Sequence, residues 1–154
     1  MDLSTLPTVS DKIVLADIHP DYAKLEAAHV QSPDERVWVI VSQATEQDAR
    51  NRAALTARRE ASYTFGEDGK MKHAGEAVTE NVYERIMLET YCTLQDVGNL
   101  MRNGKPVFPT MPAKLGKRAD FEKAWGSLPP VLAEAIHKAV RSMNPDWDWE
   151  LGKA

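Results

Sequence analysis

The sequence predicts an α+β fold in which a small β-containing N-terminal half, with short strands and a hairpin, precedes a helical C-terminal half. Residues 37–43 (VWVIVSQ) are β-branched and aromatic on both faces, as in a strand that is covered on both sides. Residues 131–143 instead carry apolar side chains at helical spacing, and they follow the pair Pro129-Pro130, which suits a helix start.

The chain has 154 residues, of which 43% are hydrophobic and 27% are charged, so it can build a core. We expect a single domain over residues 1–154. Its parts are expected to be an N-terminal arm (1–10), a β-containing subdomain (11–77), a helical subdomain (78–144) and a C-terminal tail (145–154).

The N-terminal half is expected to begin with an arm, since residues 1–10 surround two apolar anchors with turn formers. Residues 12–18 (KIVLADI) predict a short strand. The segment after Pro20 predicts a helix, because Tyr22, Leu25, Ala28 and His29 recur at helical spacing. The strand at 37–43 follows a turn.

Thr45 begins the next predicted helix, because Asp48 stands three residues later as in a capping box. This helix runs through residues 45–61 and has an apolar face of small residues. Residues 62–74 (SYTFGEDGKMKHA) then predict a β-hairpin, with Asp68 and Gly69 as its turn pair.

The C-terminal half is expected to open with a long helix over residues 80–104, capped by Thr79. Its end is expected at Gly104, or earlier at Gly98. Three prolines predict an extended connection over residues 105–117. Two further helices are expected, one short (119–128) and one final, ended by Asn144 and Pro145. The apolar stripe of the long helix comprises Tyr83, Ile86, Thr90, Leu94, Val97 and Met101.

Composition narrows the functional class. The formal charge of −4 and the pI near 5.6 argue against a generic DNA-coating protein. The first twenty residues lack a signal-peptide pattern, and no apolar run approaches the roughly 18 residues of a membrane span. Cys92 is the only cysteine, so no internal disulfide can form and we expect a reducing cytoplasm.

Motifs of catalysis are missing from the sequence: it contains no phosphate-binding loop, GxGxxG, GxSxG or HExxH. Asp17, His19 and Asp21 could hold Mn or Fe(II), but a strand end with turn-forming residues is the favoured interpretation. Cys92 with His137 could form a nucleophile pair, but a buried cysteine is favoured. We therefore expect no catalytic, cofactor-binding or metal-binding residues and no enzyme activity.

A basic segment with interleaved Phe108 and Phe121 extends over residues 102–123, into the predicted short helix. It could be a solvated connector, meet an acidic protein partner, or grip phosphates and stack a base. Its basic residues are Arg102, Lys105, Lys114, Lys117, Arg118 and Lys123.

Three tryptophans lie near the C-terminus. Trp125 follows Phe121 by four residues, which predicts that both face the core beside the final helix. Trp147 and Trp149 alternate with carboxylates. They could fold back onto the protein, or they could be presented to a protein partner, since Trp is enriched at interface hot spots.

Several segments occur in one order that resembles small tail-morphogenesis proteins of long-tailed bacteriophages, described as tail assembly chaperones. The resemblance spans residues 36–147, and its most specific part is the closing Trp, Leu-Pro-Pro, helix and Asn-Pro-x-Trp sequence. The segments are VWVIVSQATEQDARNR, the predicted hairpin, YERIMLETYCTLQDVGNL, GKPVF and FEKAWGSLPPVLAEAIHKAVRSMNPDW.

The resemblance implies a non-catalytic protein of the infected host cytoplasm that binds other tail proteins, above all a tape-measure protein, before the tail tube polymerises. Self-association is a further expectation, whereas neither a membrane nor nucleic acid is an expected partner. The expected partner-binding residues are Trp147, Trp149, Phe108, Arg102, Lys105, Lys114, Lys117 and Arg118.

Two alternatives stay open at this point. The chain could be a structural component of the virion at the neck or tail, held by its terminal arms. It could also be a small nucleic-acid-binding or inhibitory protein, an interpretation that rests on the basic segment alone.

Overall fold

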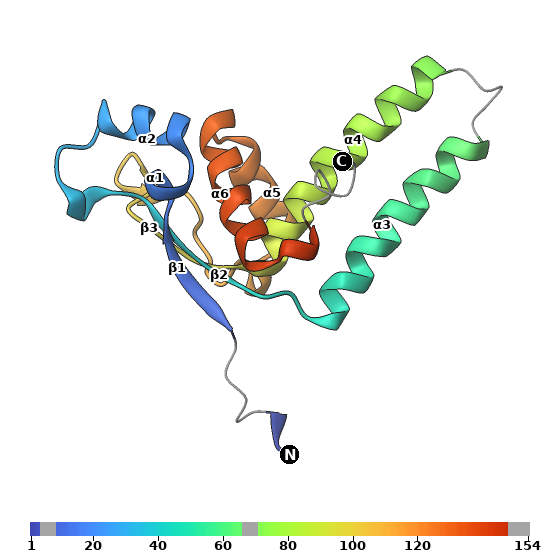
Figure 1. The fold of residues 1–154 in the computed structure, drawn as a ribbon, viewed down its shortest axis with the longest axis horizontal. Helices are drawn as coiled ribbons and strands as arrows, with labels where there is room; N and C mark the ends of the chain where they lie inside the picture. The colour runs from blue at the N-terminus through green and yellow to red at the C-terminus, as the bar shows by residue number, and fades with distance from the viewer. Residues whose placement is uncertain (4–8, 66–70, 148–154) are drawn as a thin grey trace.

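A computed structural model describes residues 1–3, 9–65 and 71–147, and their side chains except those of residues 56–65 and 71–81. It confirms the predicted α+β class: a small antiparallel sheet lies beside a group of helices (Figure 1). No helix in the described ranges is long and apolar enough to cross a membrane.

The sheet has three antiparallel strands in the order β1–β2–β3. They are β1 (Ser10–Val14), β2 (Trp38–Ser42) and β3 (Leu94–Gly98). The central strand β2 confirms the predicted strand, and Val39 and Val41 on one face are fully buried. Its other face differs from the expected full cover, since Trp38 and Ile40 are only partly buried. The third strand comes from the second half of the sequence, so both halves of the chain build one sheet.

The strand β3 corrects the prediction that a helix continues to Gly98 or Gly104. The helix ends at Thr93, and residues 94–98 form a strand that pairs with β2 instead, with a register shift at Gln95. Gly98 lies against the Trp38 ring, where a Cβ atom would come within 1.9 Å of Trp38 Cε2. Long-range pairing therefore overrides an apolar pattern that also fits a helix.

The end of β1 also differs from the prediction of a strand over residues 12–18. The strand stops at Val14, and a short helix α1 (Leu15–Ile18) leads into α2 (Pro20–Ala27). His19 separates the two helices, and its Nδ1 atom accepts a hydrogen bond of 3.0 Å from the backbone N–H of Tyr22. This histidine is thus an N-cap, which satisfies a free donor of the first turn. A 3-10 turn, η2 (Pro33–Glu35), precedes β2.

The predicted β-hairpin at residues 62–74 is wrong. Residues 62–65 belong to α3 (Glu46–Phe65) and residues 71–74 to α4 (Met71–Thr93), while the proposed turn pair lies outside the described residues. No glycine or proline interrupts α3, so the helix that begins at Thr45 continues. Figure 1 shows α3 and α4 side by side as a helical hairpin that extends away from the sheet.

The predicted start of α3 is confirmed. Thr45 Oγ1 accepts a hydrogen bond of 3.2 Å from the N–H of Asp48, and Asp48 Oδ2 accepts one of 2.9 Å from the N–H of Thr45. These reciprocal bonds satisfy donors that a helix start leaves unpaired.

After β3, residues 101–106 form a two-stranded ribbon of β4 (Met101–Arg102) and β5 (Lys105–Pro106), where a helix end was expected. Its turn, Asn103 and Gly104, has φ values of 53° and 77°, as two-residue hairpin turns require. The chain continues through η3 (Ala113–Leu115), α5 (Arg118–Gly126), α6 (Pro130–Met143) and η4 (Pro145–Trp147). The short and final helices are thus confirmed.

The core lies between the sheet and α6. Ala135, Ile136, Ala139 and Val140 are fully buried on one face of α6, as its strong helical periodicity predicts. Trp125 is partly buried and packs against this core, with its ring 6.1 Å from that of Phe121. The expected subdomain boundary at residues 77/78 falls inside α4.

Candidate binding groove

The tryptophans predicted to meet a partner are not both open to one. Trp147 is only 6% exposed, and its ring lies 5.5 Å from the Arg52 guanidinium of α3. Trp147 therefore folds back onto the protein, which is the first of the two interpretations of the sequence. Trp149 lies outside the described residues, so its contact with a partner stays a prediction.

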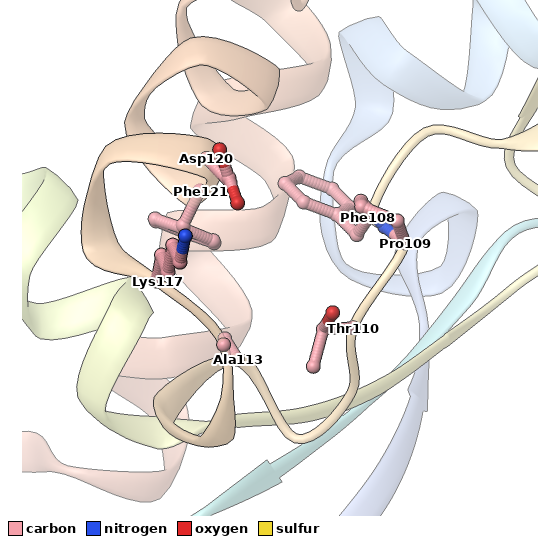
Figure 2. Close-up of a pocket in the computed structure, with 8 residues that line it drawn as sticks. Phe108, Pro109, Thr110, Ala113, Lys117, Asp120 and Phe121 are labelled. Atoms are coloured by element: carbon pink, nitrogen blue, oxygen red, sulfur yellow. The ribbon is translucent and has the colours of Figure 1, made fainter.

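Phe108 is also a core residue, at 5% exposure, and stacks on Phe121 at a ring distance of 5.5 Å. Figure 2 shows both rings at a small pocket beside Lys117 and Asp120. The pocket measures about 20 Å³, which is room for little more than one water molecule. Partner contact through Phe108 would require this packing to open.

The basic residues of the predicted contact lie at the surface, in three different settings. Arg102 donates to the carbonyl of Ser127 at 3.2 Å, which joins the β4–β5 ribbon to the end of α5. Lys105 and Lys117 are exposed. The other two, Lys114 and Arg118, line a groove that the sequence did not predict.

This groove, which we call the α4 groove, has a volume of about 410 Å³. Its floor is formed by α4, one wall by the first turns of α3, and the other wall by η3 and the start of α5. The floor carries the buried Leu88 and Cys92, one helical turn apart, beside Tyr91. The lining residues are Asp48, Asn51, Ala54, Leu55, Leu88, Tyr91, Cys92, Lys114 and Arg118.

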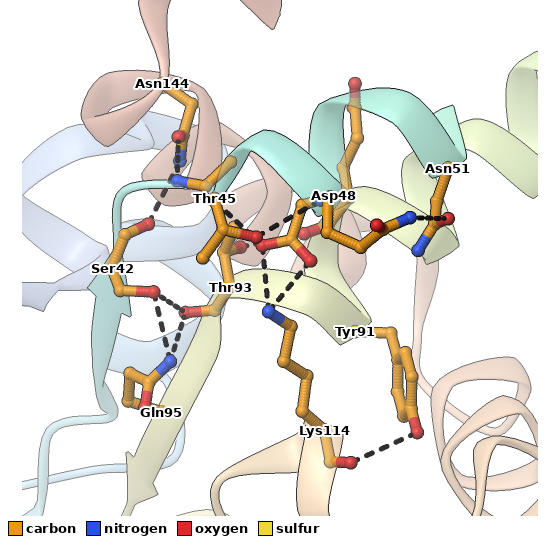
Figure 3. A network of polar contacts seen from close by, with 12 residues as sticks. Ser42, Thr45, Asp48, Asn51, Tyr91, Thr93, Gln95, Lys114 and Asn144 are labelled. Carbon is orange, nitrogen blue, oxygen red and sulfur yellow. Dashed lines mark hydrogen bonds and ion pairs between the residues drawn. The ribbon is translucent and has the colours of Figure 1, made fainter. Parts of the chain in front are cut away.

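The two walls are joined by an ion pair. Lys114 Nζ lies 2.8 Å from the carboxylate of Asp48 (Figure 3), whose side chain is 5% exposed. Burial favours the protonated acid, but the hydrogen bonds from Lys114 and Thr45 outweigh burial and hold the pKa of Asp48 below its ordinary value. Asp48 is therefore an ionised, fully engaged wall residue.

Cys92 confirms the preference for a buried cysteine, since it is 5% exposed. Burial raises the pKa of its thiol to about 12, and the neighbouring Asp48 carboxylate adds to the shift. At neutral pH the sulfur is thus protonated and a poor nucleophile. His137 is engaged elsewhere, since its Nε2 atom lies 2.7 Å from Glu89 Oε1.

A polar network fixes the junctions at the base of the helical hairpin (Figure 3). Asn144, at the end of α6, accepts from the N–H of Ala44 at 2.8 Å and donates to the carbonyl of Ser42 at 3.1 Å. Ser42 in turn donates to the carbonyl of Thr93 and accepts from Gln95. The entry to α3 and the exit from α4 are thereby held to the sheet.

The junction of α3, α4 and α6 centres on Glu89, whose side chain is fully buried. It accepts from Arg52 Nε at 2.5 Å and faces His137 Nε2 at 2.7 Å. Sequence reasoning missed this cluster, because its members are 37 and 48 residues apart from Glu89. The only hint of this cluster in the sequence is the Glu89 carboxylate itself, which stands among apolar and small residues of α4.

Within the described part of the chain, no three His, Cys, Asp or Glu side chains are grouped to hold a metal ion. His19 instead caps α2 and lies 3.6 Å from Glu134 of α6, and Asp17 lies 3.6 Å from Arg36. These polar contacts, in α1 and at the start of α2, give Asp17 and His19 structural roles.

No known protein family, curated protein or solved structure matches this chain.

Proposed function

We propose that this chain is a non-enzymatic bacteriophage assembly protein that binds other tail proteins, of the tape-measure type, in the host cytoplasm during virion morphogenesis. The observation that supports this proposal is the α4 groove. A groove with an apolar floor and polar rims, lying between helices, suits a segment of another protein.

The chemistry of the groove favours binding over bond making. Its thiol, Cys92, has a pKa of about 12 and stays protonated at neutral pH. Its carboxylate, Asp48, is engaged by Lys114 and by the backbone of Thr45. A nucleophile or general base would need a pKa close to the working pH.

Co-expression tests the proposal. The chain is produced with the tape-measure-type protein of the phage that encodes it, and we measure how much of that protein stays soluble and copurifies. Ala54→Arg places a long charged side chain on an exposed position of the groove wall. We expect at least a tenfold loss of copurified protein. Ala27→Arg, at an exposed position of α2, is the matched control and should bind normally.

The proposal fails if the tape-measure-type protein neither copurifies with the chain nor gains solubility from it. Circular dichroism of Ala54→Arg and Ala27→Arg shows whether both variants are folded, so that a loss of copurified protein is not caused by misfolding. The groove assignment alone fails if Ala54→Arg binds as well as the unaltered chain.

Mass spectrometry of purified particles distinguishes assembly from structural roles. An assembly chaperone should be absent from the particle, which is the expected result. A component of the neck or tail should be present at a fixed ratio to the other tail proteins.

A further inference from the structure

The three-stranded sheet carries apolar side chains on both faces, and α6 covers one of them. Val39 and Val41 of β2 are fully buried on the side of α6. Successive side chains of a strand alternate between the two faces, so Trp38 and Ile40 lie on the other side, where they are partly exposed. An antiparallel sheet with one solvated face normally carries polar side chains there. The second face therefore has the composition of a contact surface.

We call this second side the outer face of the sheet. Two rows of residues cross its three strands: Val14, Trp38 and Gly98 in one row, and Lys12, Ile40 and Asp96 in the other. The surface is flat at Gly98, because the Trp38 ring fills the space above this glycine, 1.9 Å from the place of a Cβ atom. A flat and partly apolar sheet face can pack against a second sheet.

Opposite charges flank the apolar centre of the outer face. Lys12 stands on one edge strand and Asp96 on the other, about 10 Å apart across Ile40. Among the residues that the structure describes, neither forms an ion pair. Lys12 Nζ lies 4.4 Å from the centroid of the Trp38 ring, which has no charge to neutralise the ammonium. Asp96 Oδ1 accepts the N–H of Val97 at 2.9 Å, and this bond likewise leaves the carboxylate charged.

We propose that the outer face is the contact between two copies of this chain, packed face to face about a two-fold axis that runs parallel to the strands over Ile40. Such an axis places Lys12 of each copy opposite Asp96 of the other, so that two ion pairs flank an apolar centre. At the roughly 10 Å separation of stacked sheets, the two side chains can meet. A two-fold axis across the strands would instead oppose like charges. The charges of the outer face therefore complement a second copy in one orientation.

The edges of the sheet argue against association through an added strand. On β1, the N–H of Lys12 points away from β2, and it donates to Asp11 Oδ1 at 2.9 Å. On β3, the outward N–H of Val97 is taken by Asp96. An added strand would have to displace a carboxylate at either edge, and charged side chains on edge strands oppose such pairing.

The size of the outer face predicts a dimer that depends on concentration. Its three strands have five residues each and span about 14 by 17 Å. A stable interface buries roughly 800 Å² on each partner, so we expect monomer and dimer in exchange. The outer face shares no residue with the α4 groove, and the inference is therefore separate from the proposed function.

Sedimentation velocity of the full chain at increasing concentration tests the inference, since mass action populates the dimer. Lys12→Glu and Asp96→Lys should each weaken self-association about tenfold, because either change turns both ion pairs into like-charge contacts. Lys24→Glu, an exposed charge reversal on α2, is the matched control and should change nothing. Ile40→Arg, at the centre of the face, should leave only monomer.

Mixing the two charge variants tests the arrangement directly. In a mixed pair of Lys12→Glu and Asp96→Lys chains, both contacts again join opposite charges. The two variants should therefore associate with each other about as strongly as two unaltered chains do. Misfolding could not be repaired by mixing, and circular dichroism of each variant checks its fold.

A chain that stays monomeric up to about 1 mM overturns the inference. Self-association that Lys12→Glu leaves intact also overturns it, as does failure of the mixed variants to associate. If Ile40→Arg still self-associates but no longer copurifies the tape-measure-type protein, the outer face binds another protein and the inference fails.

Discussion

Replacing Glu89 by Gln should destabilise the fold more than any exposed charge replacement. The substitution keeps the shape of the side chain but removes the charge that Arg52 and His137 share. Glu89 is fully buried, whereas the Arg52 side chain is 20% exposed. Breaking a buried pair by removing one partner costs about 3–5 kcal/mol. Because water reaches part of Arg52, we expect the lower end, about 3 kcal/mol.

Urea unfolding at pH 7, followed by far-UV circular dichroism, measures this loss. Glu46→Gln is the matched control, since Glu46 forms an exposed i,i+4 pair with Arg50, and should cost about 0.5 kcal/mol or less. A double-mutant cycle with Arg52→Met should give a coupling energy of at least about 1 kcal/mol.

A loss below about 1 kcal/mol for Glu89→Gln would refute the reasoning, as would additive effects of Glu89→Gln and Arg52→Met. Either result would mean that the junction of α3, α4 and α6 depends on apolar packing and not on the buried carboxylate.

Three further outcomes follow from the groove and the sheet. Asp48→Asn should lower the free energy of unfolding at pH 7 by about 2 kcal/mol. Urea titrations should show this difference shrink below about pH 4, because the folded-state pKa of Asp48 is depressed and its contribution is lost as pH falls through that value. Cys92 should react with a thiol reagent at pH 8 at least a hundredfold more slowly than a free cysteine, since its pKa is about 12; comparable rates would contradict its burial. Gly98→Ala should destabilise the fold by about 1–3 kcal/mol, because its Cβ would overlap the Trp38 ring. Thermal unfolding measures the loss, and the double variant Gly98→Ala/Trp38→Leu should recover stability.

Capping residues, prolines and apolar runs predicted correctly those elements that are determined by residues close together in the sequence. The capping pair at Thr45 and Asp48 marks the start of α3, and the Pro-Pro pair before Val131 marks the start of α6. The apolar run at 37–43 predicted the centre of the sheet. Each of these signals lies within a few residues, so no tertiary information is needed to interpret it.

Long-range pairing explains the errors. The apolar residues of 94–98 continue the helical pattern of the preceding helix, but these residues form a strand because they pair with β2. The Asp68-Gly69 pair suggested a β-hairpin, yet the segments on both sides of it belong to helices. Turn residues alone do not distinguish the connection of two strands from that of two helices.

The candidate site could be predicted only in part. Lys114 and Arg118 were singled out from sequence and do line the α4 groove. The groove itself joins residues 48–55, 88–92 and 114–118, which no local pattern brings together. Trp147 and Phe108 were expected at a partner surface because aromatic residues are common there, but large aromatic side chains serve the core equally well.

The position of α6 has a consequence for synthesis on the ribosome. The helix packs on β2, so Val39 and Val41 lack the cover of α6 until residues 130–143 have been made. A two-stranded ribbon of β1 and β2 is marginal alone, and uncovered apolar strands are prone to association. Nascent chains that stop short of α6 should therefore depend on molecular chaperones to avoid aggregation, whereas completed chains can close over their own sheet.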